Sequence, residues 1–148
     1  MTSVRRLLAA ASLLLAAGCG STFDADWEAT PASTGEGLSG CWTGTWHSDS
    51  NGHEGGLRCI MTPRAAGSFD ARYHATYDWC LLGFSFEYTV PVRAEKSGVI
   101  WTFKGGAELG CWIAGGLYEY EGRIDGGDFS ATYKSEDDHG VFRLKRVK

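Results

Sequence analysis

The chain of 148 residues is long enough for one folded domain with a buried core. Its formal net charge is −4, from 14 Lys and Arg against 18 Asp and Glu. This balance argues against a nucleic-acid partner, because proteins that bind nucleic acids carry basic surfaces. It also gives no electrostatic attraction to an anionic membrane surface.

The first residues have the pattern of a secretory signal peptide. Arg5 and Arg6 precede an uncharged apolar run over residues 7–17, which is too short for a membrane-spanning helix of about twenty residues. The end of this run at Cys19 resembles a bacterial lipobox, in which the cysteine is acylated and becomes the new N-terminus, although Ala16 stands where Leu is usual. We therefore expect a lipoprotein signal peptide over 1–18, lipidation of Cys19 and a place in the bacterial cell envelope, at the outer membrane or the periplasmic face. Ordinary cleavage with an unmodified Cys19 is the alternative.

Residues 19–39 are rich in Ser, Thr, Ala, Gly and acidic residues, and they show no apolar period. Such a composition buries little apolar surface, and it predicts a flexible tether. Docking of Phe23 and Trp27 on the folded domain is the alternative. The folded domain itself is expected over residues 40–148.

From residue 40 onward, apolar and polar residues alternate with a period of two, which is the pattern of half-buried β-strands. The alternation continues through Gly105-Gly106, and it therefore predicts one bent strand there instead of two. Pro91 lacks a backbone N–H, which indicates a sheet edge or a bulge. The predicted strands cover residues 40–48, 57–63, 69–77, 84–95, 99–109, 116–124, 129–135 and 141–148.

Eight strands joined by short loops predict an all-β protein, an eight-stranded antiparallel up-and-down meander barrel. In such a barrel the last strand pairs with the first and removes both free edges. An open two-layer sandwich is the alternative. The predicted inner face carries all six tyrosines together with Trp42, Trp46 and Trp101. An eight-stranded barrel either fills its interior with side chains or holds one small ligand, and both interpretations stay open.

The longer loops of the meander gather at one end of the barrel, at residues 49–56, 78–83, 110–115 and 136–140. Two of them contain aromatic and aliphatic side chains that a plain turn does not need. Functional residues concentrate on loops held by a rigid scaffold, and barrel mouths commonly hold ligands. We therefore expect the binding site at this end. Its candidate ligand-binding residues are Trp46, His53, Tyr77, Trp79, Trp112 and His139.

Four cysteines besides Cys19 would lie in an oxidising compartment. Cys80 and Cys111 fall in separate loops at the same predicted end, and they form the predicted disulfide. Cys41 and Cys59 fall on opposite faces of neighbouring strands, which is poor geometry for a bridge. We expect Cys59 to be a buried thiol and Cys41 to be exposed or weakly paired. No cysteine pair has the short spacing of a zinc site, and neither a metal nor a cofactor is predicted.

Two histidines lie in loops at the predicted mouth, His53 beside Glu54 and His139 beside Asp138. A metal site or an acid–base pair across the opening is one hypothesis. Two solvated loop histidines next to carboxylates are the simpler one. The sequence shows no Ser/His/Asp arrangement, no Gly-rich phosphate loop and no Cys-x-x-Cys pair, and we predict no catalytic residue.

Residues 40–46, Gly-Cys-Trp-Thr-Gly-Thr-Trp, resemble the first strand of the calycin barrels, the lipocalin and avidin group. In that group a Gly-x-Trp packs across the barrel base, so the resemblance implies the same place for Trp42. It does not extend to the residues that hold biotin in avidins or to the later lipocalin signatures, and it implies no ligand. The domain also resembles small, uncharacterised exported bacterial lipoproteins, at residues 51–53, 69–77 and 138–140.

Together these features support three hypotheses about function. The first is a monomeric, lipid-anchored envelope barrel that binds a small amphipathic or aromatic ligand at its open mouth. The second is a protein-binding module, such as an inhibitor of an envelope hydrolase, that uses the same loops. The third is a hydrolase or isomerase that uses His53 or His139. All three exclude nucleic acid, and all involve a membrane only through the N-terminal lipid.

Overall fold

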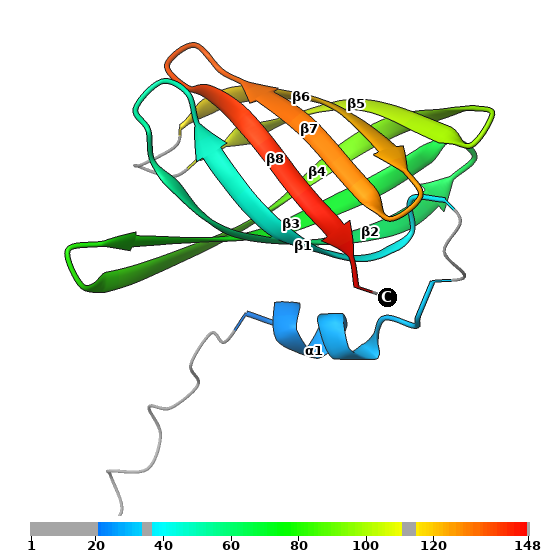
Figure 1. Cartoon of the computed structure of the whole chain (residues 1–148), viewed down its shortest axis with the longest axis horizontal. Coiled ribbons are helices and arrows are strands. Elements are labelled where there is room, and N and C mark those ends of the chain that lie inside the picture. The colour runs from blue at the N-terminus through cyan, green and yellow to red at the C-terminus, as the bar shows by residue number, and fades with distance from the viewer. Residues whose placement is uncertain (1–20, 34–36, 111–114, 148) are drawn as a thin grey trace, which may run out of the picture.

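Eight strands form one closed antiparallel barrel in the computed structural model, which describes residues 21–33, 37–110 and 115–147 (Figure 1). Each strand pairs with its neighbours in chain order, and the last strand pairs with the first. The up-and-down meander predicted from the sequence is therefore confirmed, and the open sandwich is wrong. The strands are β1 (Gly40–Ser48), β2 (Glu54–Ala65), β3 (Ser68–Trp79), β4 (Leu82–Ser97), β5 (Ile100–Leu109), β6 (Gly116–Asp125), β7 (Asp128–Lys134) and β8 (His139–Arg146).

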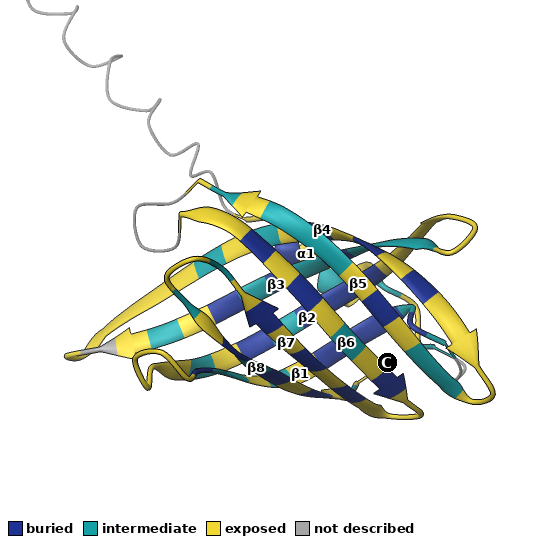
Figure 2. Cartoon of the chain, turned by 90° about the horizontal axis from the view of Figure 1, so that it is seen from above, coloured by how far each residue is buried: buried dark blue, intermediate teal, exposed yellow. Residues whose placement is uncertain are grey.

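Inward and outward side chains alternate along the strands as the sequence pattern predicts. Buried and exposed bands follow each other along the ribbon in Figure 2. In β7, for example, Phe129, Ala131 and Tyr133 are buried between exposed neighbours. Strand β5 runs unbroken through Gly105 and Gly106, as predicted, and pairs with β6 along its whole length.

The base of the barrel, where β1 begins and β8 ends, is filled by large apolar side chains. Trp42 is fully buried there and packs against Phe129. Its indole Nε1–H donates a hydrogen bond to the carbonyl oxygen of Leu38 at 3.0 Å. The guanidinium of Arg146 lies over the indole ring, 4.1 Å from its centroid. Trp42 thus closes the base, where the resemblance to the calycin barrels placed it.

Part of the segment predicted to be a flexible tether is instead folded onto the barrel. Residues Phe23–Ala29 form helix α1 against the outside of the sheet (Figure 1). Phe23 is 1% exposed and packs with Cys41 and Ile60, and Trp27 packs beside them. Cys41 is therefore buried. It was expected to be exposed or weakly paired, and the first of these two alternatives is wrong. Cys41 and Ile60 make the outward face of β1 and β2 apolar, and α1 shields this apolar surface from water. The average composition of residues 19–39 gives no sign of this role.

Two arginines of the sheet hold α1 in place. Arg58 of β2 forms an ion pair with Asp24 at 2.8 Å, and Arg72 of β3 forms one with Asp26. Both guanidinium groups also lie over the ring of Phe23, at 4.9 Å and 5.4 Å from its centroid. The helix is thus fixed by one buried ring between two cations.

Among the described residues, no helix is long and apolar enough to cross a membrane.

Strands β3 and β4 continue beyond their other partners as a projecting hairpin, which stands clear of the barrel in Figure 1. Strand β4 pairs with β5 only from Val92 to Ser97, so residues 82–91 are bonded to β3 alone in the described part of the chain. The seam between β4 and β5 is closed at the base and open toward the mouth. Pairing stops at Pro91, which has no N–H to donate, and the predicted sheet edge at this residue is confirmed.

Candidate functional site

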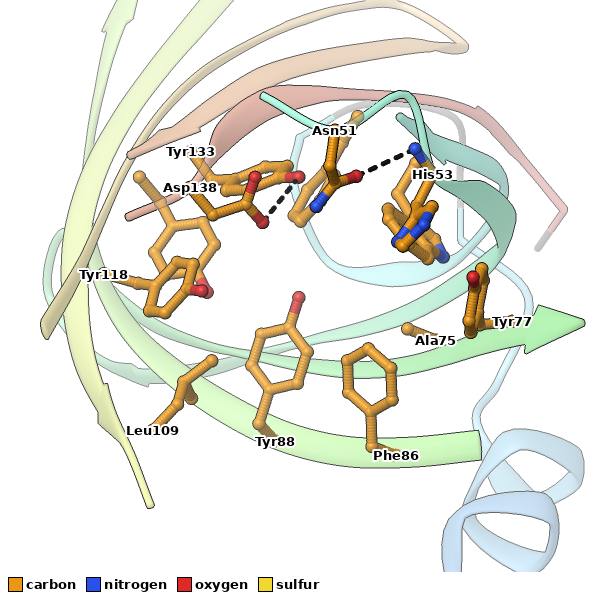
Figure 3. Close-up of a pocket in the computed structure, with 13 residues that line it drawn as sticks. Asn51, His53, Ala75, Tyr77, Phe86, Tyr88, Leu109, Tyr118, Tyr133 and Asp138 are labelled. Atoms are coloured by element: carbon orange, nitrogen blue, oxygen red, sulfur yellow. Dashed lines mark hydrogen bonds between the residues drawn. The ribbon is translucent and has the colours of Figure 1, made fainter. Parts of the chain in front are cut away.

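A small cavity lies in the barrel between the filled base and the open mouth (Figure 3). Its volume is about 110 Å³. A cavity of about 150 Å³ in another protein holds a benzene molecule, so this one has room for about a single ring. The barrel is therefore filled at its base and partly hollow toward its mouth, which combines the two interpretations that the sequence left open. The residues that line the cavity are Trp46, Asn51, His53, Ala75, Tyr77, Phe86, Tyr88, Leu109, Tyr118, Tyr120, Tyr133, Asp138 and Phe142.

Stacked aromatic rings form the floor beneath the cavity. Tyr73 is fully buried, and its ring centroid lies 5.3 Å from that of Tyr88, 6.2 Å from that of Tyr120 and 5.3 Å from that of Phe142. Its hydroxyl has no hydrogen-bond partner within the described residues. Such a packed aromatic layer fixes the positions of the tyrosines above it.

Polar groups converge on the cavity from the loops and from the strands. The Asp138 carboxylate accepts hydrogen bonds from the hydroxyl of Ser48 at 2.6 Å and from the hydroxyl of Tyr133 at 3.3 Å. The side-chain oxygen Oδ1 of Asn51 accepts a hydrogen bond from the backbone N–H of His53 at 2.9 Å, and this bond orders the loop between β1 and β2. Figure 3 shows the hydroxyl of Tyr88 pointing toward the same space. A small ligand in the cavity would therefore meet several hydrogen-bonding groups among apolar walls.

Three of the tyrosines around the cavity, Tyr88, Tyr120 and Tyr133, are neutral at physiological pH. Burial is the main cause that raises the pKa of Tyr88, Tyr120 and Tyr133, and the negative charge of Asp138 adds to the effect at Tyr133. Burial also raises the pKa of Tyr73 in the floor. These phenols are therefore hydrogen-bonding groups and π-surfaces and not phenolate bases, and Asp138 supplies the site's negative charge.

Three of the predicted ligand-binding residues come together at the cavity. The ring centroids of His53 and Tyr77 lie 4.9 Å apart, and those of Trp46 and Tyr77 lie 6.1 Å apart. The Trp46 side chain crosses to β3, where its Nε1–H donates to the carbonyl oxygen of Thr76 at 2.9 Å. It passes over Gly55, where a Cβ atom would stand 2.8 Å from that nitrogen. The mouth therefore needs a residue without a side chain at this position.

His139 does not line the cavity, although it was predicted to share the site with His53. Its Nδ1 lies 2.9 Å from the hydroxyl of Ser50, and its backbone N–H donates to the same hydroxyl at 3.1 Å. It is the first residue of β8 and is exposed. The preceding residue, Asp138, turns inward in its place, because neighbouring residues at the start of a strand point to opposite faces.

The other predicted residues at the mouth are only partly described. Trp79 ends β3 in the projecting hairpin, and Trp112 and Cys111 lie outside the described residues. Cys80 is an exposed free thiol at the hairpin tip, so the predicted disulfide is not shown. Cys59 is buried, as expected, and burial raises its pKa.

Sequence reasoning did not assign Asp138 or Asn51 to the site. Both lie in loops, where no periodicity indicates which side chains turn inward. The inner-face tyrosines were predicted by strand alternation, although only Tyr77 was named as a ligand-binding residue. Within the residues that the structure describes, no group of three or more His, Cys, Asp or Glu side chains is arranged to hold a metal ion.

Comparisons with known proteins assign neither a family nor a function to the chain. The chain matches no protein-family model, and no curated protein or solved structure is similar to it at a significant level. The closed eight-stranded antiparallel barrel is compatible with a calycin-like fold. Any functional conclusion therefore depends on the cavity and its surroundings.

Proposed function

We propose that the protein binds a small amphipathic or aromatic ligand in the cavity at the mouth of the barrel. The observation that carries this proposal is an aromatic-walled cavity of about 110 Å³ with a few polar groups directed into it. Ligand sites are typically concave and apolar with a few placed polar groups. Sites for drug-sized molecules measure about 300–1,000 Å³, so the enclosed part of this ligand is about one ring in size.

The cavity extends to the stretch of β4 that does not pair with β5. Phe86 and Tyr88 line the cavity from the part of β4 that lacks β5 as a partner. Leu109 lines it from the end of β5, beyond the last residue that pairs with β4. The cavity wall on this side is therefore formed by parts of two strands that are not paired with each other.

The cellular setting is a further part of the proposal, supported by the sequence alone. A basic start, a short apolar run and the lipobox-like end at Cys19 support export and lipidation in a bacterial envelope. The calycin kinship is supported by the Gly-x-Trp of β1 and by Trp42 at the barrel base. In this setting the barrel acts as a monomeric binding protein that is held at the membrane by its lipid.

Cavity-filling variants test the binding proposal. Benzyl alcohol, a neutral single-ring amphiphile, is expected to bind the wild-type protein in an NMR titration. Ala75→Leu places a larger side chain in the cavity, and Leu109→Phe does so from another strand. Each is expected to weaken binding by about tenfold or more, which corresponds to about 1.4 kcal/mol. Ala65→Leu, at the exposed end of β2, is the control and should bind normally. Wild-type protein without affinity for single-ring compounds would contradict the proposal, as would normal binding by both filled variants.

A protein partner is the second candidate function, favoured by the projecting β3–β4 hairpin. Leu81 is fully exposed, Leu82 is 60% exposed and Phe84 is 37% exposed. Exposed apolar groups that lie together commonly mark an interaction surface, and the unpaired edge of β4 can accept an added strand. Leu82→Ser with Phe84→Ser should abolish capture of an envelope protein and leave benzyl alcohol binding unchanged. The third hypothesis, a hydrolase or isomerase that uses His53 or His139, stays a hypothesis; of these two histidines, His53 lines the cavity and His139 does not.

A further inference from the structure

Among the described residues, those that line the cavity include one acidic side chain and no lysine or arginine. We infer that the natural ligand carries a positively charged nitrogen, an amine or a quaternary ammonium group, which binds at the Asp138 carboxylate. This inference rests on the proposed function and narrows it to one chemical class of ligand.

The first argument concerns the charge of Asp138. A carboxylate in a partly desolvated, apolar site is costly unless a cation or several hydrogen bonds compensate for it. Asp138 receives its two side-chain hydrogen bonds from neutral hydroxyls, those of Ser48 and Tyr133. No basic side chain in the described part of the chain forms an ion pair with it. A carboxylate can accept about four hydrogen bonds, so it retains capacity for the N–H groups or the charge of a ligand.

The second argument concerns the aromatic walls. Cations are attracted to the faces of tyrosine, tryptophan and phenylalanine rings. Trp46 lines the cavity, and Figure 3 shows Tyr88, Tyr118 and Tyr133 around the same space. The phenol oxygens can also accept hydrogen bonds from an ammonium group. An aromatic enclosure with one carboxylate is thus complementary to an organic cation.

The third argument excludes a negatively charged ligand. An anionic ligand would meet the Asp138 carboxylate inside the cavity and would find no lysine or arginine to bind it. The turn that holds Asp138 also exposes Glu136 and Asp137 to solvent. Their charges add to a negative potential at the mouth, which attracts cations and repels anions. His53 also lines the cavity, and its ring lies against that of Tyr77.

Three ligands of similar size test the inference on the full chain. Benzylammonium, benzyl alcohol and benzoate differ in charge and share one ring. Benzylammonium is expected to bind at least about tenfold more tightly than benzyl alcohol, the gain typical of a hydrogen bond to a charged group. Benzoate is expected to bind more weakly than both.

Asp138→Asn removes the charge and keeps the shape, because the amide can still accept one hydroxyl and donate to the other. This variant should lose the preference for benzylammonium over benzyl alcohol, because it removes the charge to which the ammonium group binds. Asp137→Asn removes the same charge from the neighbouring exposed position, and it should keep the preference. Carboxyl ¹³C chemical shifts of the wild-type protein provide a second measurement, in which the Asp138 signal should move with benzylammonium and not with benzyl alcohol.

Failure of this inference can be distinguished from failure of the proposed function. If none of the three compounds binds, both proposals are wrong. If benzyl alcohol binds as tightly as benzylammonium, the barrel is a binding protein for neutral ligands and the inference is overturned. The inference is also overturned if Asp138→Asn keeps the preference, or if the Asp138 carboxyl signal does not respond to benzylammonium.

Discussion

Docking of α1 on the barrel depends largely on one side chain, Phe23, and its truncation gives a prediction with a definite size. Phe23 is 1% exposed, and burying such a side chain contributes about 2 kcal/mol. Two arginines lie over its ring, and together these contacts contribute about 1 kcal/mol. Phe23→Ala should therefore lower the free energy of unfolding by about 3 kcal/mol, which corresponds to a drop in Tm of about 10 °C for a domain of this size.

The variant should release the helix and leave the barrel folded. A helix of seven residues has almost no stability of its own, so loss of its buried ring frees the whole segment. Hydrogen-exchange mass spectrometry should show loss of protection over residues 21–33 and retained protection in the strands. Phe84→Ala is the matched control, because it removes the same ring from a more exposed position on the hairpin. It should change Tm by no more than about 2 °C.

Two results would refute this reasoning. An unchanged Tm with full protection of α1 would show that the ion pairs of Arg58 and Arg72, and not Phe23, hold the helix. Loss of protection throughout the strands would show that the barrel cannot fold without α1, and that the helix is an integral part of the core.

Two further predictions concern the barrel interior. Gly122→Ala places a Cβ atom 2.1 Å from the ring of Phe103, and this overpacking should cost about 1–3 kcal/mol in urea denaturation. Gly127→Ala, which meets nothing within 4 Å, should be nearly neutral by the same measurement. Buried tyrosines with raised pKa values stay protonated in the folded chain, whereas they ionise near pH 10 when it unfolds. The contribution of these tyrosines to the free energy of unfolding should therefore be constant below about pH 10 and should decrease above it. Absorbance at 295 nm should show these tyrosines ionising together with the loss of β-structure in circular dichroism, and ionisation within a folded barrel would contradict the assignment. The tyrosines concerned are Tyr73, Tyr88, Tyr120 and Tyr133.

The barrel could be predicted because its signal is local. Alternation with a period of two decides which side chains face the core, and a slip of one residue would expose all of them. The continuous pattern through Gly105 and Gly106 was therefore enough to predict the unbroken β5. The place of Trp42 at the base was implied by the resemblance of residues 40–46 to the calycin barrels and not by the alternation, and Trp42 is buried there.

Strand ends near the mouth were predicted less well. Strand β2 begins at Glu54 and includes Gly55 and Gly56, which have no side chains and so show no alternation. The turn between β3 and β4 is only Cys80-Leu81, and both residues have positive φ. Tight hairpin turns of this kind usually contain Asn or Gly, and the absence of that signal led to a longer predicted loop.

Two contacts that depend on the assembled surface did not follow from the sequence for a different reason: docking of Phe23 and Trp27 was only the alternative to a tether, and the inward turn of Asp138 was missed. The docking of α1 follows from the apolar outward patch of Cys41 and Ile60 and from two arginines on separate strands. The inward turn of Asp138, in place of His139, depends on where β8 begins. A short stretch of neighbouring residues shows neither which side chains form a surface patch after folding nor at which residue β8 begins.

The two tryptophans at opposite ends of the barrel provide the most direct test of the binding site. The indole N–H of Trp46 bonds to Thr76 at the cavity, and that of Trp42 bonds to Leu38 at the base. In ¹H–¹⁵N NMR spectra, saturation with benzylammonium should move the Trp46 indole signal and leave the Trp42 indole signal in place. An unmoved Trp46 signal, or equal movement of both, would contradict a ligand site at the mouth.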